Sequence, residues 1–242
     1  KVWAQGFTGK GQTIAVIDSG IFPHADLKDR LVGWVDLANG KNKASDSWGH
    51  GTHVAGIAVG SGKKSDGQVK GVAPEANLVG IRISSVEQAI QGLQWVIDNK
   101  DLHNIGVVNV SLGDTATQGH ETDPWCQAVQ KAIDAGLTVV VAAGNEGERG
   151  IQSIATPGIS PNAITVGGVD DQGTQDPADD TLYRGSSLGP TPFDKLVKPD
   201  VMAPAISIYS TLSPGSGLDD RRKNRPQGDY IAMEGTSMAT PA

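Results

Sequence analysis

The sequence of 242 residues contains one cysteine, Cys126, few aromatic residues and no long apolar run. A single cysteine excludes an internal disulfide. No base is apparent beside it, so we interpret Cys126 as a small buried residue on a helix. No apolar run approaches the roughly 18 residues that a membrane helix needs, so we expect no membrane partner. The compartment stays open, with secretion favoured over the cytoplasm.

An excess of positive charge is also missing. Lysine and arginine number 20 against 27 acidic residues, which gives a formal net charge of −7. Nucleic-acid binders usually carry a basic face, so we expect no nucleic-acid partner. Hydrophobic residues make up 38% and aromatic residues 5%, with 32 glycines, which indicates a globular chain with an aliphatic core and many tight turns. The length suits one large domain.

Patterns typical of metal sites are absent as well. Neither a His-Glu-x-x-His sequence nor the spacing of an EF-hand loop occurs. His50 and His53 lie three residues apart, but zinc would need a third ligand of similar quality. We therefore predict no metal, and a structural role for His53. Three further histidines are expected to be exposed and not catalytic: His24, His103 and His120.

Short apolar runs alternate with segments of helical periodicity. Such alternation predicts βαβ units and a mostly parallel sheet covered on both faces, an α/β fold of three layers. Helices are predicted over 49–59, over 86–100 and from Asp123-Pro124 to Gly136, where Asp is an N-cap and Gly closes the helix. Strands are predicted over 13–17, 76–83, 106–110, 137–143, 163–166 and 205–209. Exposed loops are predicted over 170–180 and 213–229.

Three sets of residues lie just past the ends of these strands: Asp18, Ser111-Leu112-Gly113 and Asn145. Active sites of parallel sheets lie beyond the carboxyl ends of the strands, so we expect these residues to converge. Taken singly, an aspartate at position 18 is equally typical of a helix N-cap or of a turn. Asn145, between glycines, is typical of a turn and could instead donate its amide to an oxyanion.

Ser237 lies among small residues in Gly235-Thr236-Ser237-Met238-Ala239-Thr240-Pro241-Ala242, and five residues follow it. Any base that activates this serine must therefore lie upstream. The nucleophile motif Gly-x-Ser-x-Gly does not occur here because position 239 is alanine. The hydrolase fold that carries this motif also places its acid and base after the serine in the sequence. Alone, a serine before a helix is usually a cap.

Four motifs occur in order: Asp-Ser-Gly at Asp18, His-Gly-Thr-His-Val-Ala-Gly at His50, Ala-Ala-Gly-Asn-Glu-Gly around Asn145, and Gly-Thr-Ser-Met-Ala-Thr-Pro at Ser237. Together they resemble the subtilisin-like serine proteases, most nearly the bacterial AprX-like branch, from Gly9 to Pro241. The resemblance implies the subtilisin-like fold over residues 1–242 as a single peptidase domain. It also implies a catalytic triad of Asp18, His50 and Ser237, with Asn145 in the oxyanion hole, and a reaction without a cofactor.

The same resemblance implies how a substrate binds. Ser111, Leu112 and Gly113 would pair with an extended peptide. Ala142, Ala143 and Gly144 would form a wall of the specificity pocket, with Ala155 at its base and Glu146 at its rim. We therefore expect protein or peptide substrates with an apolar or aromatic residue before the cut. The family also implies a cleaved pro-segment, and we expect a monomer.

The chain departs from the family pattern at three places. Ile81 to Ser85 passes almost directly into the helix at Val86, without the usual glycine-rich segment, so we expect a more open cleft. The usual calcium loop is not evident over 60–71, where Lys63 and Lys64 would oppose a cation. The chain also ends inside the nucleophile helix, which suggests that C-terminal elements are lacking. Two alternatives stay open: a catalytically silent fragment or peptide-binding module on this fold, and a metal-dependent hydrolase using Asp18, His50 and His53.

Overall fold

The computed structural model describes residues 3–174, 176–220 and 228–242. By its internal contacts the chain divides into two compact units. The first comprises Lys1–Val108 and Tyr209–Ala232, and the second comprises Asn109–Ile208 and Met233–Ala242. The division falls within strand β4. It does not test the prediction of a single peptidase domain, which stays a prediction.

Helices and strands alternate through most of the described chain. The helices are α1 (His50–Val59), α2 (Val86–His103), α3 (Pro124–Asp134), α4 (Gly217–Asp220) and α5 (Thr236–Ala239), with short 3-10 turns η1 (Trp3–Gln5), η2 (Lys63–Ser65) and η3 (Gly147–Arg149). The strands are β1 (Thr13–Asp18), β2 (Leu31–Asp36), β3 (Asn77–Arg82), β4 (Ile105–Val110), β5 (Thr138–Ala142), β6 (Ile164–Asp170), β7 (Thr181–Leu182), β8 (Val201–Pro204), β9 (Ile208–Thr211) and β10 (Tyr230–Met233).

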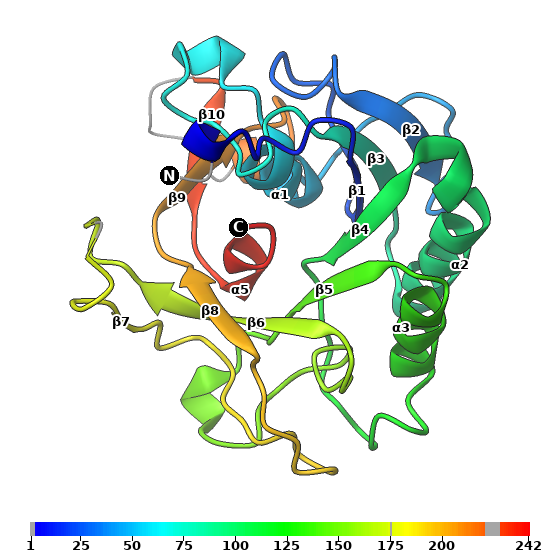
Figure 1. Ribbon diagram of the computed structural model, residues 1–242, viewed down its shortest axis with the longest axis vertical. Helices are drawn as coiled ribbons and strands as arrows, with labels where there is room; N and C mark the ends of the chain where they lie inside the picture. Colours follow the sequence, from blue (N-terminus) through cyan, green and yellow to red (C-terminus); the bar gives the residue numbers. More distant parts are fainter. Residues whose placement is uncertain (1–2, 175, 221–227) are drawn as a thin grey trace. The chain divides into compact units, whose positions relative to one another are not determined.

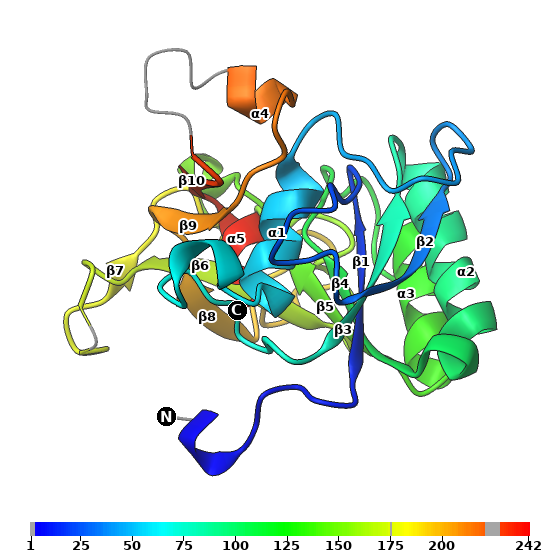
Figure 2. The same ribbon diagram turned by 90° about the horizontal axis from the view of Figure 1, so that it is seen from above.

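The first unit is built around β1, whose residues are almost all buried. β1 pairs in parallel with β3, which pairs in parallel with β2. Figures 1 and 2 show α1 and α2 on opposite sides of β1, so both faces of this strand are covered. Its continuous apolar run follows from that burial, since a strand covered on both faces has no solvent side for polar residues.

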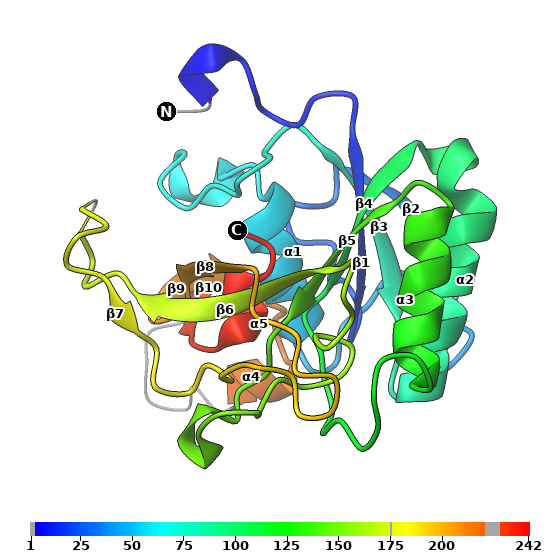
Figure 3. The same ribbon diagram turned by 60° about the horizontal axis from the view of Figure 1, so that its bottom comes forward.

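The second unit is built around β6, which pairs in parallel with β5 and β8 and antiparallel with β7. Figure 3 shows α3 and α5 on opposite sides of β5. Ala239 of α5 packs with Val166 of β6 and with Ala205 in one apolar cluster. The α/β class, with a mostly parallel sheet flanked by helices, is therefore confirmed.

Most predicted elements are confirmed within a few residues at their ends. Asp123 caps α3 as expected, since its carboxylate accepts hydrogen bonds from the N–H groups of Trp125 and Cys126. The strand predicted over 205–209 was wrong in its start, because β9 begins at Ile208. The strand predicted over 163–166 runs on to Asp170. Strand β2 was missed although Leu31 to Val35 form a short apolar run, and the strand is only half-buried.

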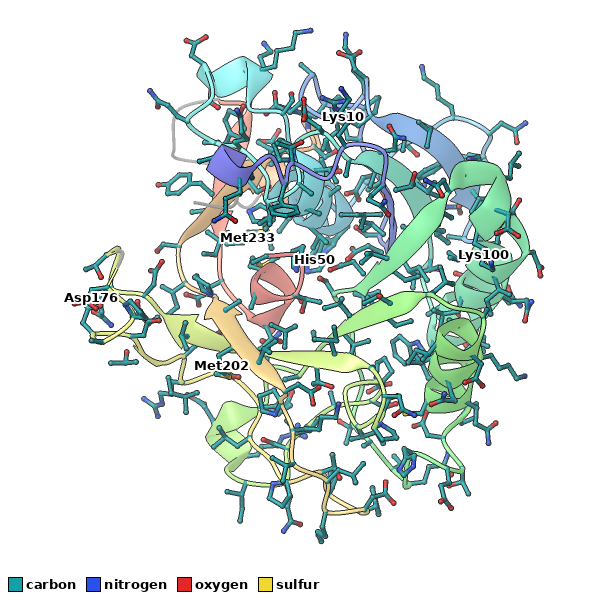
Figure 4. The ribbon with its side chains drawn as sticks, in the orientation of Figure 1. Lys10, His50, Lys100, Asp176, Met202 and Met233 are labelled. Atoms are coloured by element: carbon teal, nitrogen blue, oxygen red, sulfur yellow. The ribbon has the colours of Figure 1, made fainter. Side chains whose placement is uncertain are left out.

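The loop predicted over 170–180 is exposed beyond Asp171 in its described residues, and Figure 4 shows Asp176 at its outer end. The loop predicted over 213–229 differs. Ser213, Ser216 and Leu218 are buried, so the expected exposure was wrong there, and residues 221–227 lie outside the described residues. In the described ranges no helix combines the length and apolarity needed to cross a membrane.

Candidate active site

Asp18 and His50 form a close pair in the first unit. The Nδ1 atom of His50 lies 2.8 Å from Oδ1 and 3.0 Å from Oδ2 of Asp18. An ionised carboxylate can only accept hydrogen bonds, so Nδ1 carries the proton and Nε2 of the neutral ring is left as the acceptor. Asp18 is 1% exposed and also accepts from the N–H of Ser19 at 2.7 Å. This is the arrangement of a histidine oriented to act as a base.

A glycine makes this approach possible. A Cβ atom at Gly51 would lie 2.3 Å from the carbonyl oxygen of Gly20 and 2.9 Å from Cβ of Asp18. Any larger residue would push the first turn of α1 away from the end of β1. The glycine that follows His50 in the sequence therefore has a steric role, since it sets the distance between the imidazole and the carboxylate.

Charge around His50 raises its pKa above 6.5. Burial by itself lowers the pKa of His50, because it disfavours the charged ring. The charge and hydrogen bond of Asp18, with the charge of Asp46, outweigh burial and produce the net rise. The surroundings of His50 therefore favour the imidazolium more than water does around a free histidine, which suits a residue that has to hold a proton.

Sequence reasoning missed Asp46, which holds the chain on either side of His50. Its carboxylate accepts from the N–H of Gly49 at 2.8 Å and from both the N–H and the hydroxyl of Thr52, at 2.9 and 2.7 Å. It also accepts from the hydroxyl of Ser19, the residue after Asp18. An acidic residue three positions before Gly49 is a pattern typical of a capped turn, and it was available in the sequence.

The other histidines make contacts of their own. His53 is fully buried, with Nε2 3.0 Å from the carbonyl oxygen of Ile231, which agrees with a structural role. His120 pairs with Asp194 at 2.8 Å, and His103 ends α2; both are half-buried, not exposed as predicted. His24 is 3% exposed, so the prediction that it is exposed was wrong. His24 accepts a hydrogen bond from the N–H of Asp26, and its ring lies against Tyr230 of β10. The turn-like sequence around His24 did not indicate this burial.

Asn145 and Thr236 are joined in the second unit. Oδ1 of Asn145 accepts from the N–H of Thr236 at 2.9 Å and from its hydroxyl at 3.0 Å. Two donors at the oxygen fix the orientation of the amide, so its NH₂ group is free to donate elsewhere. Thr236 precedes Ser237, and Asn145 therefore lies beside the predicted nucleophile. The sequence had placed these two residues 91 positions apart.

Ser237 is held by a second pair of hydrogen bonds. Its hydroxyl donates to the carbonyl oxygen of Ser111 at 2.8 Å, and the hydroxyl of Ser111 donates to the carbonyl oxygen of Ser237 at 2.8 Å. The side-chain amide of Asn109 donates to the Ser111 hydroxyl at 3.0 Å. Ser111, which the resemblance assigns to substrate, thus supports the segment that carries Ser237.

A cavity of about 360 Å³ opens beside Ser237 and Asn145. Five of the residues predicted to bind substrate are among those that line it: Leu112, Gly113, Ala142, Gly144 and Ala155. Glu146 lines it too. Ala143 is fully buried and packs with Cys126 and Ile154. Small residues keep the cavity open: Gly144 has a φ of +105°, and a Cβ there would lie 2.8 Å from Cβ of Ala155.

Other predictions bear on this region. Cys126 is buried on α3, and burial raises the pKa of its thiol to about 11, which agrees with an unreactive residue. Only residues 83–85 separate β3 from α2, as the predicted short connection requires. In the described part of the chain, no three His, Cys, Asp or Glu side chains gather in a metal-binding cluster.

Comparison with known proteins gives consistent matches. A model described as the subtilase family matches residues 9–242. The chain is 45% identical over 250 residues to serine protease AprX of Bacillus subtilis (strain 168), covering 98% of the chain and 56% of that relative. It is 34% identical over 249 residues to subtilisin DY of Bacillus licheniformis, covering 100% of the chain and 77% of that relative. The chain thus spans little more than half of AprX.

Solved structures also superimpose on this chain. The structure titled S41 psychrophilic protease superimposes with a TM-score of 0.79 at 31% identity, covering 97% of this chain and 74% of that one. Sphericase superimposes with a TM-score of 0.79 at 28% identity, with the same coverage of both chains.

Proposed function

The chain belongs to the subtilase family, and on that premise we propose that it is a serine endopeptidase that hydrolyses peptide bonds through Asp18, His50 and Ser237. One observation carries the proposal. His50 donates from Nδ1 to a buried carboxylate, which leaves Nε2 as the base. The fixed amide of Asn145 beside the segment of Ser237 supports it.

In the proposed reaction the hydroxyl of Ser237 turns from the carbonyl oxygen of Ser111 to Nε2 of His50, which takes the proton while the serine oxygen attacks the scissile carbonyl. Asp18 keeps the ring in its tautomer and stabilises the imidazolium. The carbonyl oxygen becomes an oxyanion, which the NH₂ group of Asn145 and the backbone N–H of Ser237 would stabilise. His50 then gives the proton to the leaving amine as the carbon–nitrogen bond breaks.

The resulting acyl-enzyme is hydrolysed by the same groups. Water attacks the ester carbonyl and gives a proton to His50, the oxyanion forms again, and the ester bond to Ser237 breaks. The proton returns to the serine oxygen and the acid product leaves. No step requires a cofactor.

Substrates of the proposed enzyme are proteins or peptides with an apolar or aromatic side chain before the cut. The cavity of about 360 Å³, with Ala142, Gly144 and Ala155 among the residues that line it, supports this specificity. Leu112 and Gly113 are exposed enough to pair with an extended peptide in the manner of an added strand.

Labelling with a fluorophosphonate tests the proposal, since this probe reacts only with an activated serine hydroxyl. We expect the native chain to be labelled and to cleave casein, and we expect both signals to vanish in Ser237→Ala and His50→Ala. Ser84→Ala is the matched control, because it removes an exposed serine hydroxyl on the connection before α2. A folded native chain that is neither labelled nor active would contradict the proposal and favour the silent fragment.

A further inference from the structure

A second cavity, of about 490 Å³, borders the other side of the Asn145 segment in the second unit. Its walls come from η3, from the stretch after β7 and from Glu234, which lies between β10 and α5. The walls are tied together, since the N–H of Gly147 donates to the carbonyl oxygen of Gly185 at 2.9 Å. Asn145, Glu146 and Arg149 line both cavities, so the two are neighbours.

The charges around this cavity do not balance. Two of its three carboxylates have cationic partners: Glu146 lies 2.7 Å from Arg149, and Glu148 lies 3.4 Å from Arg184. Among the described residues no ion pair reaches the third, Glu234, which is exposed. The cavity therefore carries a surplus negative charge.

An aromatic ring forms part of the wall beside these carboxylates. Tyr183 packs against the buried cluster of Val166, Ala205 and Ala239. A Cβ atom at Gly185 would lie 2.5 Å from the Tyr183 hydroxyl oxygen, so glycine leaves room for the ring. Burial raises the pKa of Tyr183, and the charges of Glu234 and Glu148 raise it further. The same negative potential that opposes a phenolate attracts a cation.

The position of this cavity tells which part of a substrate reaches it. In the proposed reaction the residues before the cut lie along Leu112 and Gly113, which line the first cavity and not the second. Asn145, which would hold the oxyanion, lines both. A side chain that enters the second cavity therefore belongs to the peptide after the cut.

We propose that this second cavity selects a lysine or arginine at the first or second position after the cut, with Glu234 as the residue that determines the choice. The inference rests on the proposed function and names part of its substrate. The ammonium or guanidinium group would pair with Glu234 and lie against Tyr183, where ring and carboxylate both attract it.

Quenched fluorescent peptides that share one sequence before the cut, and carry Lys, Gln or Glu in turn at each of the two positions after it, test the inference. We expect kcat/KM at the responsive position to be about two- to fivefold higher with Lys than with Gln, and lowest with Glu, as an exposed ion pair allows. The preference should weaken at high salt, because both charges are in contact with solvent.

Variants assign the preference to a residue. In Glu234→Gln the ratio of Lys to Gln substrates should approach one, and in Glu234→Lys the Glu substrate should become the best of the three. Glu121→Gln removes the same charge at an exposed position of the second unit that does not line the cavity, and should keep the preference.

Peptide binding to Ser237→Ala gives a readout that does not need catalysis. Anisotropy with the same labelled peptides should show a lower Kd for Lys than for Gln, and this difference should disappear when Glu234→Gln is added. Equal Kd and equal kcat/KM for all peptides would overturn the inference while leaving the protease proposal intact. A preference that survives Glu234→Gln would overturn it as well. Absent labelling and cleavage would instead count against the proposed function.

Discussion

Ser111 and Ser237 hold each other through two hydrogen bonds of equal length. Each hydroxyl donates to the backbone carbonyl of the other residue at 2.8 Å. Ser111 follows β4 and Ser237 lies in α5, 126 residues further along the chain. The end of a sheet strand thus positions the proposed nucleophile directly.

Ser111→Ala should therefore lower kcat more than it changes KM. The substitution leaves the amide of Asn109 and the carbonyl of Ser237 without their buried partner, which costs about 1–3 kcal/mol. Steady-state kinetics and thermal unfolding measure the two effects. Thr13→Val is the control, since it removes another buried hydroxyl bonded to a carbonyl, that of His103. It should lower Tm with little change in kcat. An unchanged kcat in Ser111→Ala would show that Ser111 does not position Ser237.

Asn145→Ala should lower kcat by roughly 10²–10³ with a small change in KM, because the oxyanion forms only in the transition state. This magnitude is the loss of kcat found when the oxyanion-hole asparagine of subtilisin is removed. Kinetics on one chromogenic peptide measures the change, with Asn162→Ala as the control. Asn162 donates to Gln130 on the surface. Equal kcat in the native chain and Asn145→Ala would remove Asn145 from the proposed oxyanion hole.

The pH profile of kcat/KM should rise with a midpoint above 6.5. The base works only when neutral, and the pKa of His50 is raised. Because the pKa is raised, His50 stays protonated up to a higher pH, and the acid limb of the kcat/KM profile shifts to higher pH. Asp18→Asn removes the charge that raises the pKa, and should shift the midpoint downward as well as lower kcat. A profile that is flat from pH 5 to 9 would contradict a general-base role for His50.

Acid should destabilise the protein through His24. Burial lowers the pKa of His24 below 6.5, and the opposing charges of Asp26 and Asp229 do not restore it. The unfolded chain then binds the proton more readily, so stability present above pH 6.5 is lost as pH falls through and below that value. Tm measured between pH 7.5 and 5 should fall less in His24→Asn than in the native chain. His103→Asn is the control. An equal fall of Tm in the native chain, in His24→Asn and in His103→Asn would contradict the assignment to His24.

Ala155→Phe should narrow the first cavity. Ala155 is 6% exposed, and its Cβ lies 3.1 Å from where a Cβ at Gly113 would stand. A large side chain there leaves less room for the residue before the cut. We expect kcat/KM for a peptide with Phe at that position to fall at least tenfold relative to one with Ala. An unchanged ratio would show that the cavity does not receive this residue.

The candidate site could be proposed from the sequence because each of its residues lies in a local pattern that resembles a family motif. Asp18 ends an apolar strand, His50 lies between glycines at a helix start, and Asn145 follows another strand. The helix caps at Ser85 and Asp123 are equally local, since a side chain and an N–H two or three residues on form them. Such features need few neighbours from elsewhere in the chain. The predicted α/β class rested on an equally local signal, the alternation of short apolar runs with helical periodicity.

Contacts between distant segments could not be read in the same way. The edge strand β2 pairs with β3, and the ring of His24 lies against Tyr230 of β10, and neither contact is local in the sequence. The sequence determined the order of the four motifs, on which the choice of the proposed catalytic residues rests. Only the tertiary structure decided that Ser111 supports Ser237, that Asp46 holds the turn of His50, and that Glu234 faces a second cavity. Hydrogen bonds and charges act through space, and residues 126 positions apart leave no periodic trace of their pairing.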